Sequence, residues 1–170
     1  MTEPNHPFWK RIVQRIFMTR PFAWLGLHVF ARIDPILMRL SKGRVYSSRG
    51  MGLLSILLTT TGAKSGQPRQ AALLAFEDGD DLFVIASRGG NPRHPSWYHN
   101  LKSNQRATVV WGGREEKRIA LEAASPERER LWQKAMSIFP TFDRYQERTG
   151  GRRVPVIVLQ RLATGSPNHG

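Results

Sequence analysis

Residues 53–69, LLSILLTTTGAKSGQPR, decide the fold that we expect for this chain. Apart from Ser55, the first eight residues are apolar or β-branched, which is typical of a buried strand. The run ends in a turn at Gly62 and Gly66, and glycines permit positive φ and close approach of the backbone. This turn combines hydroxyls with fixed positive charges and so favours an anion, the alternative being an ordinary solvated hairpin. The side chains concerned are Thr61, Lys64, Ser65 and Arg69.

Five further strands are expected downstream of this run. Segments 71–76, 82–87, 107–111, 115–122 and 154–160 are apolar, β-branched or alternating. The Asp-Gly pair in EDGDD at 77–81 signals one hairpin turn, and Gly112-Gly113 signals another. Strands that follow one another through hairpins argue against a doubly wound sheet. The pattern therefore predicts a mainly β (α+β) fold, a small antiparallel barrel with appended helices.

Helices are expected on both sides of the barrel sequence. Residues 7–18, a segment opened by Pro21 and a short segment from Asp34-Pro35 to Gly43 make residues 1–50 helical, aromatic and basic. Ser125-Pro126-Glu127 predicts a helix start with Ser125 as the hydroxyl cap, and this helix runs to about residue 138. A short helix over 142–148 follows. We expect N-terminal helices over 1–50, a barrel over 51–162 with a helical insertion before its last strand, and a disordered tail over 163–170.

The chain of 170 residues is strongly basic, with 26 Lys and Arg against 13 Asp and Glu. Nine of these basic residues lie in residues 1–50, against only Glu3 and Asp34. Such an excess fits nucleic acid, an anionic membrane surface or an anionic small molecule. No run reaches the roughly 18 apolar residues expected of a spanning helix, and no secretory signal pattern is present. Cysteine is absent, which excludes disulfides and thiolate metal sites.

A second segment, HPSWYHNL at 94–101, follows a loop that begins at Ser87 and Arg88. Ser87 stands at the end of an expected strand, where the mouth of a barrel usually places ligand contacts. Trp97 and Tyr98 suit packing on a flat ring. The alternative is that both aromatic residues belong to the core and anchor a short helix capped by Asn100.

A third segment, FPTFDRYQ at 139–146, places Phe142 and Tyr145 on one helical face. The phenol of Tyr145 could donate a proton beside a ring, or the two aromatic residues could simply pack on the barrel. No metal site is expected, because His94 and His99 lack the spacing of a helical ligand pair. The signatures of a two-carboxylate hydrolase and of a Gly-x-Ser-x-Gly acyl transferase are also missing.

These three segments in this order resemble the deazaflavin-dependent nitroreductase family, whose members use reduced coenzyme F-420, an 8-hydroxy-5-deazaflavin. The resemblance covers about residues 53–162. It is carried by LLTTTGAKSG with Arg69, by Ala86-Ser87 before Gly89-Gly90, by HPSWYHNL, and by Tyr145-Gln146 before VPVIVL. Ala63 stands where an arginine is common and Ala72 where a proline is common, which weakens the expected clamp on the cofactor.

The resemblance implies a split β-barrel oxidoreductase that transfers a hydride from reduced coenzyme F-420 to a quinone, a nitro compound or an activated alkene. It implies that Lys64, Ser65 and Arg69 hold the phosphate and acidic tail of the cofactor. It further implies that Tyr145 borders the substrate pocket, and that Ser87 or Tyr145 protonates or hydrogen-bonds the reduced acceptor. The residues expected along the deazaflavin are Ser87, Arg88, Trp97, Tyr98, His99 and Asn100.

Alternatives to this function stay open at this stage. They are a split-barrel oxidoreductase that binds FMN, and a basic barrel that binds nucleic acid or membrane without catalysis. Nucleic acid is disfavoured because the aromatic residues do not alternate with basic residues along the strands. We expect a small-molecule electron acceptor as the partner.

Residues 1–45 have a basic amphipathic character with Trp9 and Trp24, which suits an anionic membrane surface. A lipophilic quinone would be met there. The alternative is that these helices cover the barrel or pack in a homodimer. We therefore expect a cytoplasmic protein, and a peripheral position on the inner face of the plasma membrane stays open beside packing of these helices on the barrel.

Overall fold

A computed structural model describes residues 34–162, so the expected helices before residue 34 and the tail from residue 163 lie outside the described residues. A helix over residues 34–40 begins this range, as the Asp34-Pro35 pair predicts. The strands are β1 (Ser55–Thr61), β2 (Pro68–Asp78), β3 (Asp81–Ile85), β4 (Arg106–Trp111), β5 (Arg114–Glu122) and β6 (Val156–Arg161). The other helices are η1 (Ser47–Met51), η2 (Arg88–Gly90), α3 (Ser96–Ser103), α4 (Glu127–Ile138) and α5 (Thr141–Arg148).

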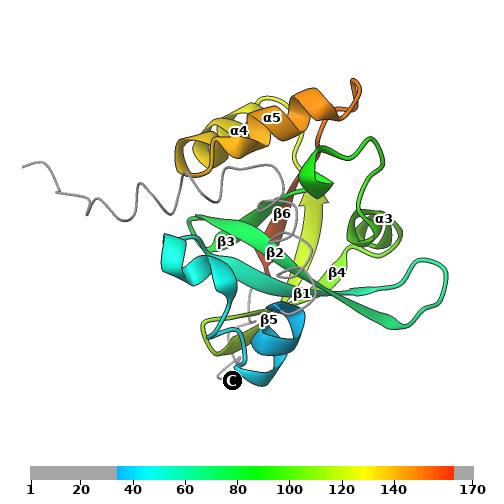
Figure 1. The fold of residues 1–170 in the computed structure, drawn as a ribbon. Helices are drawn as coiled ribbons and strands as arrows, with labels where there is room; N and C mark the ends of the chain where they lie inside the picture. Colours follow the sequence, from blue (N-terminus) through cyan, green and yellow to red (C-terminus); the bar gives the residue numbers. More distant parts are fainter. Residues whose placement is uncertain (1–33, 163–170) are drawn as a thin grey trace, which may run out of the picture.

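The six strands form one closed antiparallel barrel in the order β1-β2-β3-β6-β5-β4 (Figure 1). The pairs β1–β2, β2–β3 and β4–β5 are hairpins, and β1 closes the barrel by pairing with β4, with Leu57 opposite Val110. The last strand enters between β3 and β5, with Ile85 opposite Val156. The predicted antiparallel barrel with a helical insertion before its last strand is therefore confirmed.

Alternation along the strands divides the buried residues into two apolar clusters. Leu82 and Val84 of β3 point into the barrel, whereas Phe83 and Ile85 point outward into a cluster with α4 and α5. Strand β6 repeats this arrangement. Because helices cover the outer face of β3 and β6, these two strands are apolar on both faces, which explains their continuous apolar sequence (Figure 1).

The start of α4 differs from the prediction. Ser125 was expected to cap this helix with its hydroxyl, but Pro126 precedes the first helical residue and no side chain caps the helix. The Ser125 hydroxyl instead accepts a hydrogen bond from Nη2 of Arg153, at 3.2 Å. The capping prediction is wrong because a contact with the segment before β6 uses the same oxygen.

The turn at Lys42 and Gly43, which follows the helix over residues 34–40, joins this helix to the β4–β5 hairpin of the barrel. The backbone N–H groups of Gly112 and Gly113 donate to the carbonyls of Gly43 and Lys42, at 3.1 and 2.9 Å. Gly43 has a φ of +74°, and a Cβ there would lie 2.7 Å from Cα of Trp111. Glycine is therefore required where this segment joins the β4–β5 hairpin.

Candidate functional site

The β1–β2 hairpin projects from the barrel beside α3, and its tip is the cationic turn singled out by the sequence (Figure 1). The tip is closed by hydrogen bonds from the Gly62 N–H to the Gln67 carbonyl and from the Gly66 N–H to the Gly62 carbonyl, at 2.9 and 2.8 Å. A Cβ at Gly62 would lie 2.7 Å from the Ser65 hydroxyl. The missing side chain of Gly62 therefore lets Ser65 fold back over the turn.

The polar side chains of this turn are directed to solvent rather than to carboxylates. Lys64, Ser65 and Arg69 are exposed, and Nη2 of Arg69 donates to the Ser65 hydroxyl at 3.4 Å. Neither Lys64 nor Arg69 makes an ion pair within residues 34–162. Beside them an open hollow of about 450 Å³ is lined, among the described residues, by Arg39, Pro68, Arg69 and Gln70. Two unpaired cations and a hydroxyl at one turn suit an anionic group.

Asn100 joins this hairpin to α3. Its Oδ1 accepts from the Ala63 N–H and its Nδ2 donates to Oγ1 of Thr60, both at 3.0 Å. The Thr60 hydroxyl in turn donates to the Arg69 carbonyl at 3.3 Å. Asn100 lies in the middle of α3, so it does not cap this helix as the alternative interpretation required. Its amide, 8% exposed, holds the cationic turn in place.

The aromatic residues of α3 are used largely in packing. Trp97 is 9% exposed and belongs to the apolar cluster inside the barrel. Tyr98 stacks on His94 with 4.5 Å between ring centroids, and its hydroxyl donates to Oε2 of Glu122 at 3.0 Å. Burial, followed by the hydrogen bond and charge of Glu122, raises the pKa of Tyr98 to about 12. His99 contacts both of the stacked rings edge-on.

Ser87 follows β3 and begins a tight loop at the same end of the barrel as the hairpin tip. Ser87 is buried, and within the described part of the chain its hydroxyl has no hydrogen-bond partner yet stays accessible to solvent. Arg88, Gly89 and Gly90 all have positive φ. Arg88 is exposed and donates to the His94 carbonyl at 3.3 Å. The loop thus presents one free hydroxyl and one cation.

Tyr145 lies on α5, which packs against this loop. A Cβ at Gly90 would lie 3.1 Å from Cα of Tyr145, so α5 and η2 meet backbone to backbone. The ring of Tyr145 contacts Phe142 edge-on at 5.9 Å, and burial raises the pKa of its phenol. The phenol is therefore neutral and able to donate a proton near neutral pH. Its hydroxyl has no partner among residues 34–162.

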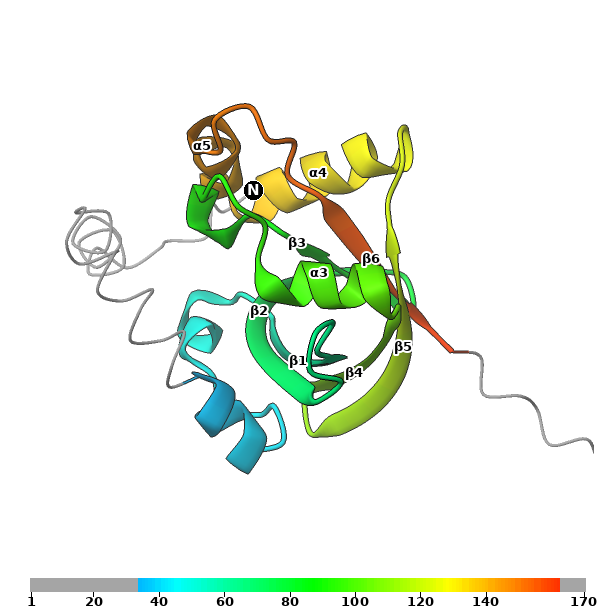
Figure 2. The same cartoon turned by 90° about the vertical axis from the view of Figure 1, so that its right-hand side faces the viewer.

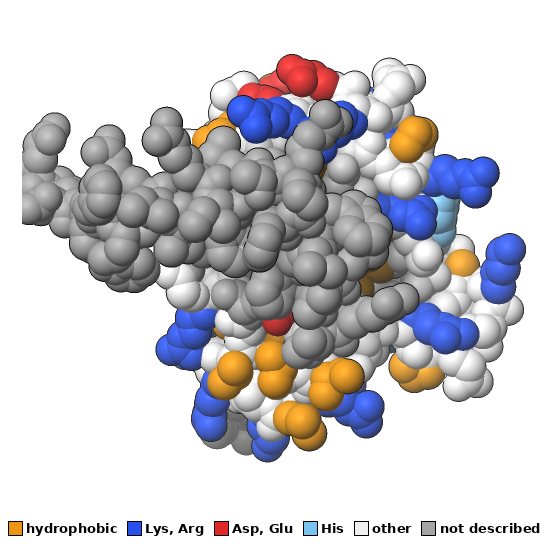
Figure 3. Space-filling view, viewed as in Figure 1, with side chains coloured by type: hydrophobic (Ala, Val, Ile, Leu, Met, Phe, Trp, Pro, Cys, Tyr) orange, Lys and Arg blue, Asp and Glu red, His pale blue; other side chains and the backbone are white. Residues whose placement is uncertain are grey.

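The space-filling view shows how charge is distributed around these elements (Figure 3). Lys and Arg side chains gather along the edge formed by the β1–β2 hairpin and the loop before α3, with a histidine among them. In the same view the acidic side chains lie mainly at the top, over α4 and α5, rather than along this edge. The candidate site thus lies on the electropositive edge.

Comparison with known proteins identifies the family of this chain. Residues 31–161 match the family described as F-420H(2)-dependent quinone reductase. The chain belongs to this family. An F-420H(2)-dependent quinone reductase of Mycobacterium tuberculosis is 38% identical in an alignment of 147 residues that covers 81% of this chain and 96% of that protein.

Solved structures give the same result for the fold. A reductase dependent on reduced F-420 is 39% identical, with a TM-score of 0.58, over 62% of this chain and 93% of its own. A second structure, described as a domain-swapped dimer, is 33% identical with a TM-score of 0.59 over 82% of this chain and 99% of its own. The resemblance to deazaflavin-dependent reductases and the split-barrel fold are therefore confirmed.

The residues at the site fit the cofactor that the family name implies. Two exposed cations without carboxylate partners among residues 34–162 and the accessible hydroxyl of Ser87 suit a ligand with an anionic arm and a polar ring. The described residues contain no group of three His, Asp or Glu side chains that could hold a metal ion.

Sequence reasoning did not predict the contacts that hold the elements of the candidate site together. Arg152, Gln146 and His94 connect α5, the segment before β6 and the Ser87 loop. Arg152 contacts residues about sixty positions earlier, so no local pattern marks it. Arg39, which lines the hollow beside the cationic turn, was likewise one basic residue among many.

Asn100→Ala should loosen the cationic turn. The substitution removes the acceptor of the part-buried Ala63 N–H and the donor to the buried Thr60 hydroxyl, which costs about 1–3 kcal/mol of unfolding free energy. Thermal unfolding measures this loss, and amide hydrogen exchange should rise at residues 62–67. Unchanged exchange at these amides would show that Asn100 does not fix the turn.

Proposed function

We propose that this chain is an oxidoreductase that uses reduced coenzyme F-420 to reduce a small-molecule acceptor, namely a quinone, a nitro compound or an activated alkene. Membership of a family of F-420H(2)-dependent quinone reductases over residues 31–161 supports the cofactor and the reaction class. The observation that carries the proposal is the cationic turn, whose Lys64 and Arg69 have no carboxylate partner within the described residues.

The turn would hold the anionic arm of the cofactor. Lys64 supplies a point charge, Arg69 a planar fork of donors and Ser65 a hydroxyl. The Thr61 hydroxyl accepts from Nδ2 of Asn104 at 3.4 Å, so it keeps one donor for a ligand. Arg88 adds positive charge from the neighbouring loop.

Most residues of α3 would hold other parts of the site in place rather than contact the cofactor. Trp97 and Asn100 are committed to protein partners, so we assign them to placing the helix against the hairpin. Tyr98, half-buried on His94, is the aromatic side chain of α3 that could still border a ring. This proposal refines the expectation that all three lie along the deazaflavin.

When bound, reduced coenzyme F-420 supplies a hydride to the acceptor. A hydride brings two electrons and one proton, so reduction of a quinone to a quinol needs one more proton. Tyr145 would hold that proton at Oη, because burial keeps its phenol neutral. The free hydroxyl of Ser87 would donate a hydrogen bond at the barrel mouth.

Removing the two cations of the turn tests the proposal. Lys64→Ala with Arg69→Ala should raise the Kd for coenzyme F-420 at least tenfold, because charge-assisted hydrogen bonds contribute about 1.5–3 kcal/mol. Fluorescence titration measures the Kd. Arg114→Ala with Lys117→Ala removes the same charge from two exposed residues of β5 and is the control. Equal affinity of both double variants would contradict a specific anion site, and failure of the unchanged chain to bind would contradict the cofactor.

Tyr145→Phe should lower kcat with a quinone acceptor at least tenfold, since a positioned general acid contributes about 100-fold or more. The Kd for the cofactor should change little, because the ring and its contact with Phe142 are kept. Steady-state kinetics with a soluble quinone and the titration above give the two values. A kinetically silent Tyr145→Phe would remove the phenol as proton donor.

We further propose that the protein meets its acceptor at an anionic membrane surface. Ile36, Leu40 and Val45 are large apolar residues 60%, 79% and 53% exposed, on or just after the helix over residues 34–40. Basic residues surround them, and Figure 3 shows apolar and basic side chains together at this end of the molecule. Apolar side chains ringed by Lys and Arg suit the interface of an anionic bilayer. Among the described residues, no helix is long and apolar enough to cross a membrane.

Ile36→Ser with Leu40→Ser should reduce co-sedimentation of the full chain with vesicles rich in anionic lipid. The loss of apolar contact should exceed that caused by Ile138→Ser, an exposed apolar residue at the end of α4. High salt should weaken binding further, because the basic rim is screened. Equal sedimentation of the double variant and the control would contradict a membrane role for this helix.

A homodimer is also proposed as an assembly of this chain. A relative that is 33% identical is described as a domain-swapped dimer. Light scattering on the purified chain distinguishes a monomer from a dimer.

A further inference from the structure

The loop that carries Ser87 and Arg88 is held by one guanidinium from a distant part of the chain. Nη1 of Arg152 donates to the Ala86 carbonyl at 3.3 Å and contacts Nδ1 of His94 at 3.0 Å. Nη2 donates to the carbonyls of Ser87 and Asn91, at 3.1 and 2.8 Å. One guanidinium group, that of Arg152, thus contacts the beginning, the middle and the end of the segment 86–94.

This loop does not have a conformation that its sequence prefers. Arg88 has a φ of +52°, which is uncommon for a residue with a side chain, and Gly89 and Gly90 follow at +65° and +83°. Three successive residues in the left-handed region need tertiary contacts to hold them. The contacts come from Arg152 on one side and from the backbone of Tyr145, against Gly90, on the other.

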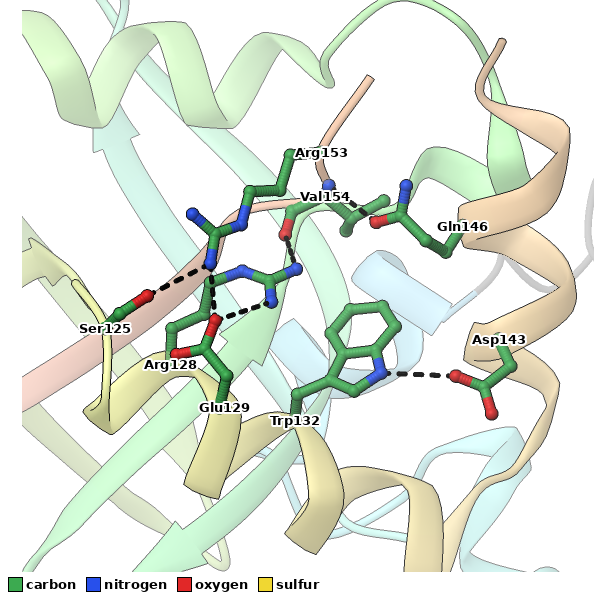
Figure 4. Close-up of polar contacts among 8 residues, drawn as sticks. All are labelled: Ser125, Arg128, Glu129, Trp132, Asp143, Gln146, Arg153 and Val154. Carbon is green, nitrogen blue, oxygen red and sulfur yellow. Dashed lines mark hydrogen bonds and ion pairs between the residues drawn. The ribbon is translucent and has the colours of Figure 1, made fainter. Parts of the chain in front are cut away.

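Arg152 is itself held by the residue next to Tyr145. Nε2 of Gln146 donates to the Arg152 carbonyl, and Oε1 of Gln146 accepts from the Val154 N–H, both at 2.8 Å. The Thr149 hydroxyl also contacts the Arg152 carbonyl, at 2.7 Å. Figure 4 shows Gln146 reaching from α5 to Val154. Hydrogen bonds therefore run from α5 through Arg152 to the Ser87 loop.

We propose that Arg152 is a positioning residue, which holds the Ser87–His94 loop against α5 so that Ser87, Arg88 and Tyr145 face one ligand. This inference rests on the proposed function for the identity of that ligand. The hydrogen bonds to residues 86–94 stand without it.

The contact with His94 makes this arrangement sensitive to pH. An arginine only donates, so Nδ1 of His94 must accept and cannot carry a proton. Burial lowers the pKa of His94, and the charges of Arg152 and His99 lower it further, against a smaller opposite effect of Glu122. Tyr98, stacked on the ring, and Arg88, at the His94 carbonyl, complete its surroundings. As pH falls below the histidine range, protonation of His94 removes the acceptor and sets two cations side by side.

Arg152→Met tests the proposal, with Arg153→Met as the matched control. Arg153 carries the same charge one residue on, but it points the other way, to Ser125 and Glu129 on the side of α4 (Figure 4). Amide hydrogen exchange of the cofactor-free protein should rise at residues 86–94 in Arg152→Met and stay unchanged in Arg153→Met. In the unchanged protein, exchange at the same residues should rise once the pH falls below about 6.5, the ordinary pKa of histidine, after correction for the intrinsic rate.

The same variants separate positioning from folding. Arg152→Met should lower kcat/KM with a quinone by about 100-fold, as expected for a misplaced reacting group. Arg152→Lys, which keeps the charge and serves as the second variant if Arg152→Met does not fold, should recover only part of the loss, because a single ammonium cannot reach acceptors that a planar fork spans. Loop exchange and kcat/KM that match those of Arg153→Met would overturn the proposal. A chain that shows the loop effect but binds no coenzyme F-420 would overturn the proposed function instead.

Discussion

The pairing of β6 between β3 and β5 is the constraint on which the site depends. After β5 the chain has to return to the edge of β3, and it does so through α4 and α5, which cover the outer face of β3 and β6 (Figure 2). Because Ile85 pairs with Val156, the residues just before β6 lie beside the residues just after β3, and the Ala86 N–H donates to the Pro155 carbonyl at 2.9 Å. Arg152 and the Ser87 loop are neighbours for this reason.

The basic residues of the chain have two different kinds of surroundings. Arg118 in β5 is buried, but it is paired with Glu116 and donates to the Leu159 and Asp80 carbonyls. Asp78 accepts from both Arg130 and Lys134, and these two hydrogen bonds hold the pKa of its carboxyl far below the usual range. These cations are therefore neutralised by carboxylates. The cations at the β1–β2 turn make no ion pair within residues 34–162, so their positive charge is left for a partner outside the chain or for solvent.

Much of the barrel could be predicted from the sequence, because each strand is a run of apolar or alternating residues bounded by glycine or by an Asp-Gly turn. The order in which the strands pair could not be predicted, because the apolar sequence of β6 fits any buried strand and does not indicate which strands lie beside it. Residues 94–101 are rich in aromatic and polar groups with a weak helical period, so α3 was considered only as an alternative. Ser125 shows a different limit: its sequence is a good helix start, but Arg153 competes for the same hydroxyl.

The residues of the candidate site also differ in how far the sequence predicts their roles. The residues of the cationic turn are close together in the sequence, so they could be identified from one segment. The roles of Asn100 and Arg152 depend on partners far away in the sequence, which are fixed only when the barrel closes.

A contrast in hydrogen bonding separates the groups that hold the site from those that would act in it. Asn100 and Gln146 use both ends of their amides, and Arg152 reaches four acceptors. By contrast, the hydroxyls of Ser87 and Tyr145 have no partner among residues 34–162, although both residues lie in well-packed surroundings. Neither hydroxyl is among the buried side-chain atoms without a partner in the described part of the chain, whereas Nε of Arg152 is. The two hydroxyls are therefore open to solvent and to the ligand that we propose, while the hydrogen bonds of Asn100, Gln146 and Arg152 restrict where that ligand can lie.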